Sequence, residues 1–495
     1  MNNKKYRTCL NPFQHSTRKQ GARRPPILLP GQEVRKIPAA VRFVFVLLFL
    51  AAALLHTPPL YAADNEITVA ALGDCVVSRK ISTGENPAFL ELVELLRRAD
   101  CTYGNCETTL YDPDEGFPAW KKLPGPHHFC RPWGADELKW MGIDLVSLAN
   151  DHMMDFAYRG LFSTLQNLDR VGIVYAGAGK DLEHAAQPGY IDTAGGRVGL
   201  VSSCSSIFEI NSQASPQHPH LAGRPGINPL NVEFSIQVKA DLLKKISDLK
   251  DKILNAAGIP IEPREIEDIE AVNYSLELRF VKGDQPGFLL SPLKLYKDSE
   301  RILAAVKRAK NNSRLVLAAL HEHRGCAGNT RPSKFQEEFA RQSIDKGADM
   351  FVGTGSHVLW GLEIYQGKPI FHGLGNFLSH EIGLIAAEDY EKMGLPADTL
   401  DPMSYAAKFG KFLKTGKNRE SIVPLVTFSG ENKIKKIELY PIVLENNVSL
   451  SRRGTPRLAE GEKAAAILSR FKEISAVYGT EIVLEKGVGM VVLKK

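Results

Sequence analysis

The chain has 495 residues, 44% hydrophobic and 24% charged, which is the balance of an ordinary globular protein. Its net charge of +6 is misleading, because residues 1–42 hold ten lysines and arginines against one acidic residue, Glu33. Without this head the chain is mildly acidic, with a net charge of −3. We therefore expect no basic nucleic-acid footprint and no nucleic-acid partner.

Residues 1–63 form a basic head that resembles an export signal. An uncharged apolar run, Phe43–Leu55, follows the basic region and is short for a membrane span but suits the apolar core of a signal peptide. Cleavage after Ala62 or Ala63 would release the remainder, whereas an uncleaved run would anchor it in the membrane. In both cases we expect an exported protein of the periplasm or the cell surface.

Strand-like and helix-like segments alternate from residue 67 onward. This alternation predicts an α/β fold over residues 64–445. The first predicted elements are strands at 67–72, 101–107 and 142–150, and amphipathic helices at 87–100 and 158–171.

Two segments differ from this rhythm. Residues 205–313 are rich in Ser, Pro, His and charged residues, and we predict an insertion that is either a lid over the active face or a peripheral addition. Residues 446–495 are predicted to form a C-terminal helix followed by a hairpin.

The cysteine pattern argues against a structural zinc site, because no CxxC pair occurs among the seven cysteines. In an oxidising compartment, one disulfide among Cys101, Cys106 and Cys130 is an open alternative. Cys75 is interpreted as a small core residue rather than a nucleophile, since the sequence supplies no partnered base.

Polar side chains follow the ends of most of the predicted strands. In an open α/β sheet such strand ends share one edge, where ligands bind. Oxygen and imidazole groups together suit Mn, Fe or Zn, and one or two such ions could polarise a substrate and activate a water. The residues concerned are Asp74, Asn105, Glu107, Asn150, His152, Asp155, His321, His323, His357 and His372.

Each of these residues also has a structural explanation. Asp74 could form an Asx turn after Gly73, His321 could be a hydrogen-bonded core histidine, and Asp155 could cap the following helix. We interpret His323 and His372 as structural. The conjunction of so many polar strand ends is what favours a divalent-metal site.

Several segments resemble, in order, the motifs of the CapA family of capsule synthesis and poly-γ-glutamate biosynthesis, which is related in fold to calcineurin-like metallophosphoesterases. They include ALGDCVVSR, GNCETTL, SLANDHMMDF, LHEHRG and GADMFVGTGSHVLWG, within roughly residues 67–380. The resemblance implies a layered metallophosphoesterase-like β-sandwich flanked by helices. It also implies an anionic polymer such as poly-γ-glutamate as partner and a membrane-bound synthase complex as neighbour.

The resemblance also assigns site residues. It implies that His152 and Asp155 are catalytic, with the pair positioning a proton donor. Asp151 stands where the family has the middle residue of Asn-Asn-His. The implied metal ligands are Asp74, Glu107, Asn150, His152, His321 and His357.

The sequence departs from the family at residues 353–357. They read Gly-Thr-Gly-Ser-His where the family has Gly-His-His-Pro-His, and Gly355 stands at a metal-ligating histidine of the related phosphoesterases. We expect this change to weaken one metal subsite, for which His323 or His372 could compensate.

Two functions are therefore predicted as alternatives. One is a metal-dependent hydrolase acting on a polyanionic polymer or a phosphoester. The other is a non-catalytic polymer-binding or export factor with a degenerate metal site.

Overall fold

The computed structural model describes residues 66–493 except 113, 115–125, 208–209, 259–270, 274–278, 285–286, 293–296, 325–330, 381–390, 392–415, 447 and 450. The chain divides into two compact units, Met1–Ala63 and Asp64–Lys495. The predicted signal peptide or anchor lies outside the described residues. Among the helices that are described, none is both long and apolar enough to cross a membrane.

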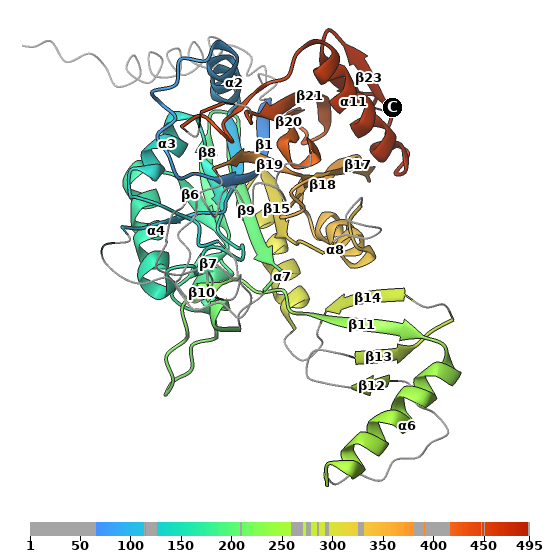
Figure 1. The fold of residues 1–495 in the computed structure, drawn as a ribbon. Coiled ribbons are helices and arrows are strands. Elements are labelled where there is room, and N and C mark those ends of the chain that lie inside the picture. Colours follow the sequence, from blue (N-terminus) through green and yellow to red (C-terminus); the bar gives the residue numbers. More distant parts are fainter. Residues whose placement is uncertain are drawn as a thin grey trace, which may run out of the picture. The chain divides into compact units, whose positions relative to one another are not determined.

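Two mixed sheets form the centre of the second unit (Figure 1). The first has the order β23-β24-β21-β20-β1-β2-β5-β6, and β19 and β22 pair with β1 and β21. Its strands are β1 (Ile67–Val76), β2 (Cys101–Cys106), β5 (Leu145–Ser147), β6 (Val174–Ala176), β19 (Asn376–Ser379), β20 (Glu420–Phe428), β21 (Ile434–Leu444), β22 (Pro456–Leu458), β23 (Ile482–Glu485) and β24 (Val488–Val491).

The second sheet has the order β17-β18-β16-β15-β9-β8. Its strands are β8 (Gly189–Thr193), β9 (Gly196–Cys204), β15 (Leu315–His321), β16 (Met350–Thr354), β17 (Leu359–Tyr365) and β18 (Lys368–Leu374). The inner faces of both sheets meet in one apolar cluster that includes Val69, Leu317, Val352 and Val426. Strands buried on both faces read as continuous apolar runs, as LVLAAL before His321 does.

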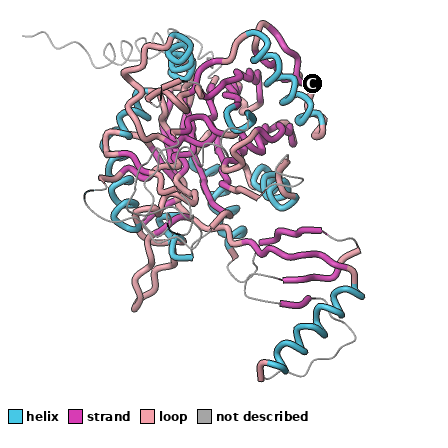
Figure 2. Tube along the Cα trace, viewed as in Figure 1, coloured by secondary structure: helices cyan, strands magenta, loops and turns pink. Residues whose placement is uncertain are grey.

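Helices cover the outer faces of the two sheets (Figure 2). Helices α2 (Pro87–Arg97), α3 (Gly134–Trp140) and α4 (Ala157–Val171) pack on the first sheet, and α7 (Asp298–Asn312) and α8 (Lys334–Asp345) on the second. Helix α11 (Gly461–Ala476) contacts β17 and β21. This layered β-sandwich flanked by helices confirms the predicted fold class.

Local sequence explains where several helices begin and end. Asn86 caps α2, because its side chain accepts a hydrogen bond from the Ala88 N–H, and Pro87 occupies the first turn. Ser333 caps α8 in the same way. Helix α4 ends at Gly172, which has a φ of 69°.

One segment connects the two sheets. Strand β18 belongs to the second sheet and β19 to the first, and Gly375, with a φ of 69°, lies between them. A Cβ added to Gly73 of β1 would lie only 1.8 Å from the Gly375 carbonyl oxygen. The passage from β18 to β19 therefore requires glycine at residue 73, because the residue 375 backbone approaches it too closely for a side chain. Glycine also suits residue 375, because the backbone there has a left-handed φ.

The insertion predicted at residues 205–313 contains a sheet of its own. Its order is β12-β13-β11-β14, and its small core includes Val238 and Leu243. Its elements are β11 (Val232–Val238), α6 (Ala240–Ala256), β12 (Ala271–Asn273), β13 (Arg279–Lys282) and β14 (Gly287–Pro292). The choice between a lid and a peripheral addition stays a prediction.

Short elements complete the described fold. Strand β3 (Thr109–Leu110) pairs with β4 (Phe129–Cys130), and β7 (Ala178–Gly179) pairs with β10 (Gly226–Ile227). Helix α5 (Leu182–Ala185) follows β7.

The disulfide alternative is wrong for the cysteines that it named. Cys101, Cys106 and Cys130 are free thiols in the core. Burial raises the pKa of Cys106 to about 12, so this thiol stays protonated at neutral pH. Cys75 is likewise buried, and burial raises its pKa well above the ordinary value, which supports its interpretation as a core residue.

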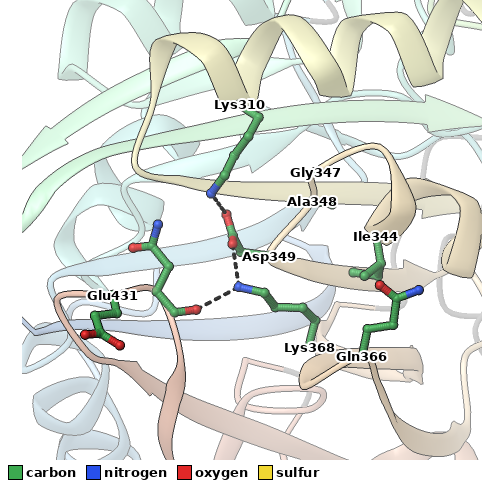
Figure 3. A pocket seen from close by; sticks show the side chains of 9 residues that line it. Lys310, Ile344, Gly347, Ala348, Asp349, Gln366, Lys368 and Glu431 are labelled. Atoms are coloured by element: carbon green, nitrogen blue, oxygen red, sulfur yellow. Dashed lines mark hydrogen bonds and ion pairs between the residues drawn. The ribbon is translucent and has the colours of Figure 1, made fainter.

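A cavity of about 320 Å³ lies where strands β15, β16 and β18 begin (Figure 3). There Asp349 pairs with Lys310 at 2.6 Å and with Lys368 at 2.7 Å. Asp349 also accepts a hydrogen bond from the Val316 N–H. These ion pairs and this hydrogen bond connect the start of β16 with α7, β15 and β18. We therefore interpret this group of residues as structural.

Candidate metal centre

The predicted site residues meet where the central strands end. Asp74 lies near the end of β1, Glu107 follows β2, and Asn150 and His152 follow β5, all in the first sheet. His321 ends β15 in the second sheet, and His357 follows β16. The structure thus brings together Asp74, Glu107, Asn150, His152, His321 and His357, while their role as ligands stays a prediction.

Asp74 is directed to this centre by an irregularity in β1. Ala71 pairs with Tyr103 and Asp74 with Asn105, so β1 has one extra residue between the two pairs. The carboxylate accepts hydrogen bonds from Asn105 Nδ2 at 2.8 Å and from the Gly355 N–H at 3.1 Å. The pKa of Asp74 is lowered to about 2: burial would raise it, but the hydrogen bond with His357, the charges of His321 and His357 and the hydrogen bond from Asn105 together outweigh burial. The Asx-turn explanation is thus not needed for this residue.

Glu107 is the least satisfied group of the centre. Its side chain is fully buried, and neither carboxylate oxygen has a hydrogen-bond partner in the described part of the chain. His152 Nε2 lies 4.0 Å from Oε1. Burial first, and then the charges of Asp74 and Asp151, raise the pKa of Glu107 well above its ordinary value.

His152 and Asp155 form a hydrogen-bonded pair. His152 Nδ1 lies 2.8 Å from Asp155 Oδ2, which also accepts a 2.6 Å hydrogen bond from the His128 N–H. The His128 ring stacks on the His152 ring with centroids 3.7 Å apart. Asp155 therefore orients His152, and the described start of α4 has no side-chain cap, so the cap interpretation of Asp155 is not supported.

Asp151 lies between two imidazoles. Its Oδ1 is 3.0 Å from His321 Nε2 and 3.2 Å from His323 Nε2, and the two nitrogens are 3.2 Å apart. Burial lowers the pKa of His321. At His323 burial acts in the same direction, but the charge and the hydrogen bond of Asp151, with the charges of Asp74 and Glu322, together outweigh it and raise the pKa to about 9. Burial would raise the pKa of Asp151, but the nearby imidazoles hold it well below its ordinary value.

His357 follows the glycine-containing loop in which the sequence departs from its family. Its φ of 56° is left-handed, and its Nδ1 lies 2.9 Å from Asn376 Oδ1 and 3.5 Å from Asp74 Oδ2. Gly355 has a φ of 82°, and a Cβ there would lie 3.0 Å from the ring of His321. The loop therefore has no room at residue 355 for a side chain unless His321 moves.

Two predicted strand-end residues lie elsewhere or have another role. His372 pairs with Glu363 at 3.2 Å and packs on Tyr478, so it does not compensate for Gly355. Asn105 supports the site by bonding Asp74 and His321. His323, interpreted as structural, instead faces the centre.

Sequence reasoning left two contributors out of the site. Asp151 stands within the Asn-Asp-His run, where the family motif marks it as a replaced position rather than as a ligand. His128 follows no predicted strand, and no local signal marks it; its position depends on β4 pairing with β3.

Among the residues that the structure describes, three groups of side chains could each hold a metal ion, with one ligand atom from each residue within 4.8 Å of the others. Glu107 belongs to all three groups. They are Asp74, Glu107 and His357; Glu107, His128 and His152; and Glu107, Asp151, His321 and His323. The oxygen and nitrogen donors and the unsatisfied Glu107 carboxylate fit a borderline divalent ion.

The double sheet, its flanking helices and this cluster at the strand ends define a metallophosphoesterase-like α/β protein. Residues 68–381 match the family of the bacterial capsule synthesis protein PGA_cap. The chain belongs to this family, which confirms the resemblance to the CapA family that the sequence motifs indicate.

Known relatives agree with this assignment. The uncharacterized protein y4sH of Sinorhizobium fredii is 34% identical over 438 residues, covering 86% of this chain and 92% of the relative. The PGA biosynthesis protein CapA of Bacillus subtilis is 23% identical and covers 68% of this chain and 71% of its own. A probable polyglutamine synthesis accessory protein of Mycobacterium tuberculosis is 24% identical and covers 50% and 46%.

Proposed function

We propose that this protein is an exported capsule-synthesis protein that uses a divalent-metal site to act on an anionic polymer such as poly-γ-glutamate. Family membership supports the polymer context. The basic head with its apolar run supports export to the periplasm or cell surface, with residues 43–55 as a potential anchor beside a membrane-bound synthase complex.

The main observation in favour of a metal site is that the Glu107 carboxylate is buried without a hydrogen-bond partner among the described residues. An ionised carboxylate without partners is costly to bury, and a bound cation offsets that cost. Glu107 is a member of each candidate ligand group among the described residues, as expected for a carboxylate shared between ions. We propose that one or two Mn, Fe or Zn ions are held by Asp74, Glu107, Asn150, His152, His321 and His357.

The side chains around the ion would divide the chemistry between them. The ion would polarise the substrate and lower the pKa of a bound water. Asp155 holds His152 through Nδ1, so that Nε2 is directed toward Glu107 and the centre. His152 can therefore hold a proton for a leaving group or bind the ion, and Asp155 fixes its orientation.

A non-catalytic role in binding or exporting the polymer is the second candidate. The loop at residues 353–357 favours it, because Gly355 supplies no imidazole, and an added Cβ there would be strained at a φ of 82° and would lie 3.0 Å from the ring of His321. In that case the protein would bind and guide the polymer without cleaving it, and the metal site would be structural or degenerate.

Metal content tests the first proposal. We expect the purified chain to contain one or two equivalents of Mn, Fe or Zn by elemental analysis, and His152→Ala to lose most of it. Cleavage of poly-γ-glutamate by the metal-loaded wild type would favour the hydrolase, and metal-dependent binding without cleavage would favour the second candidate. A chain without metal after metal is added back would contradict the metal-dependent hydrolase and leave the polymer-binding candidate.

A further inference from the structure

We propose that Asp151 and His323 complete, with Glu107 and His321, a four-ligand subsite for one borderline divalent cation. This inference rests on the proposed metal-dependent function and names two ligands that the sequence motifs do not assign. It places one ion between the end of β15 and the residues that follow β5.

The positions of three ligand atoms carry this inference. Asp151 Oδ1, His321 Nε2 and His323 Nε2 are separated by 3.0, 3.2 and 3.2 Å. Metal–ligand distances of about 2.0–2.2 Å in a tetrahedral zinc site place neighbouring ligand atoms about 3.4 Å apart. The three atoms therefore already approximate one face of such a site.

Glu107 provides the fourth ligand. One of its oxygens lies within 4.8 Å of the ligand atoms of Asp151, His321 and His323. Because neither oxygen has a hydrogen-bond partner in the described chain, this buried carboxylate is available to an ion. Two carboxylates would neutralise a divalent cation held by two neutral imidazoles.

The surrounding groups hold these ligands in place. His321 Nδ1 lies 3.1 Å from Thr354 Oγ1 and 3.2 Å from Asn105 Nδ2. For Nε2 to serve as the ligand atom, Nδ1 must carry the ring proton and donate it to the Thr354 hydroxyl, which can accept it. The backbone N–H of His323 donates to Ser206 Oγ at 2.7 Å. Ser206 in turn bonds the buried Glu322, so the segment that carries both histidines is anchored.

The loop after β16 explains why the ligands come from residues 151 and 323. A Cβ at residue 355 would lie 3.0 Å from His321 Cε1 and Nε2. A ligand side chain at residue 355 would thus collide with His321 where it now stands. Asp151 Oδ1 and His323 Nε2 lie 3.0 and 3.2 Å from His321 Nε2 with His321 where it stands.

Cobalt titration tests the subsite, because tetrahedral Co²⁺ absorbs visible light. The full chain, stripped of metal, would be titrated with Co²⁺ as wild type, His323→Gln and Asp151→Asn. His184→Gln is the matched control, since His184 also pairs with a carboxylate, Asp181, but lies outside the site. Circular dichroism in chelator would establish that each variant is folded.

We expect His323→Gln and Asp151→Asn to weaken Co²⁺ binding at least 10-fold and to change the absorption bands, with His184→Gln unchanged. Unchanged affinity and spectrum in both site variants would overturn the inference. If His152→Ala alone lost the ion, the proposed function would stand without this subsite. If the subsite variants lost the ion while polymer binding and cleavage stayed unaffected, the subsite would stand and the proposed function would fail.

Discussion

At the residue scale, two buried glutamates show how differently the same side chain can be used. Glu322 is hydrogen-bonded by Ser206 at 3.0 Å and paired with Arg324 at 2.8 Å. Glu107 is just as buried, but its oxygens have no hydrogen-bond partner in the described chain. Glu322 stabilises the fold through its own hydrogen bonds and ion pair, whereas Glu107 is suited to bind a metal ion after folding.

This contrast predicts opposite effects of removing the two charges. In chelator we expect Glu107→Gln to be at least as stable as wild type and Glu322→Gln to lose about 1–3 kcal/mol, because only the latter leaves polar partners unsatisfied. With added Zn²⁺ the wild type should gain stability by mass action and Glu107→Gln should gain less. Urea unfolding in both conditions measures these changes, and a destabilised Glu107→Gln in chelator would contradict the ligand role.

His380 predicts how stability depends on pH. It is fully buried and its Nδ1 accepts the Ser78 N–H at 3.0 Å; burial, with the charge of Arg79, lowers its pKa well below 6.5. In the unfolded chain His380 therefore takes up a proton near pH 6.5, whereas in the folded chain it stays neutral at this pH. The stability contribution is present above pH 6.5 and falls below it by up to about 1.4 kcal/mol per pH unit.

His380→Asn should reduce this slope, since an asparagine oxygen can accept the same N–H but does not titrate. Urea unfolding of both chains between pH 5 and pH 7.5 measures the difference. Equal slopes for the two chains would show that His380 is not the group responsible.

The site residues show what residue patterns can and cannot predict. Asp74, Asn150 and His321 were predictable because each directly follows an apolar run and strand ends share an edge. His323 was less predictable, because its direction depends on the turn after β15. His128 was not predictable, because it reaches the centre only through pairing of two short strands.

At the element scale, the loop after β16 decides which side chains can enter the centre. Gly355 combines a left-handed backbone with close approach to His321. We expect Gly355→Ala to lose about 1–2 kcal/mol from the backbone alone, with a further loss from the collision. The metal affinity should also fall, because His321 must move.

Gly367→Ala is the matched control for this change. Gly367 has a φ of 71°, close to that of Gly355, but no described atom lies within 4 Å of its added Cβ. Thermal unfolding and metal titration of both variants would separate the backbone cost from the collision. Equal losses in both, with metal affinity unchanged, would remove the steric argument for the missing ligand.

At the scale of the whole molecule, the alternation of strands and helices correctly indicated the layers, but not which sheet each strand joins. Strands β20 to β24 come last in the chain yet extend the first sheet from β1. Periodicity reports the buried face of a strand and not its neighbour, so this pairing was not predictable. The sheet within the insertion was missed because its segment is polar and interrupted.

Net charge makes a prediction about polymer binding. Without its head the chain carries −3, so a polyanion is not attracted by the protein as a whole. We expect binding of poly-γ-glutamate to depend on the ion and to be abolished by chelator, while rising salt weakens it only modestly. Sedimentation of labelled polymer measures this, and strongly salt-dependent, chelator-insensitive binding would point to a basic surface instead.

The passage from β18 to β19 through Gly375 has a consequence for how the molecule opens. Because one continuous segment is hydrogen-bonded into both sheets, displacing this segment as a whole would break strand pairing in both of them. An ion held by Glu107, which follows β2, and His321, which ends β15, would tie the same two sheets at a second point. Amide hydrogens in β1 and β15 should therefore exchange together as one cooperative unit, and more slowly when metal is bound.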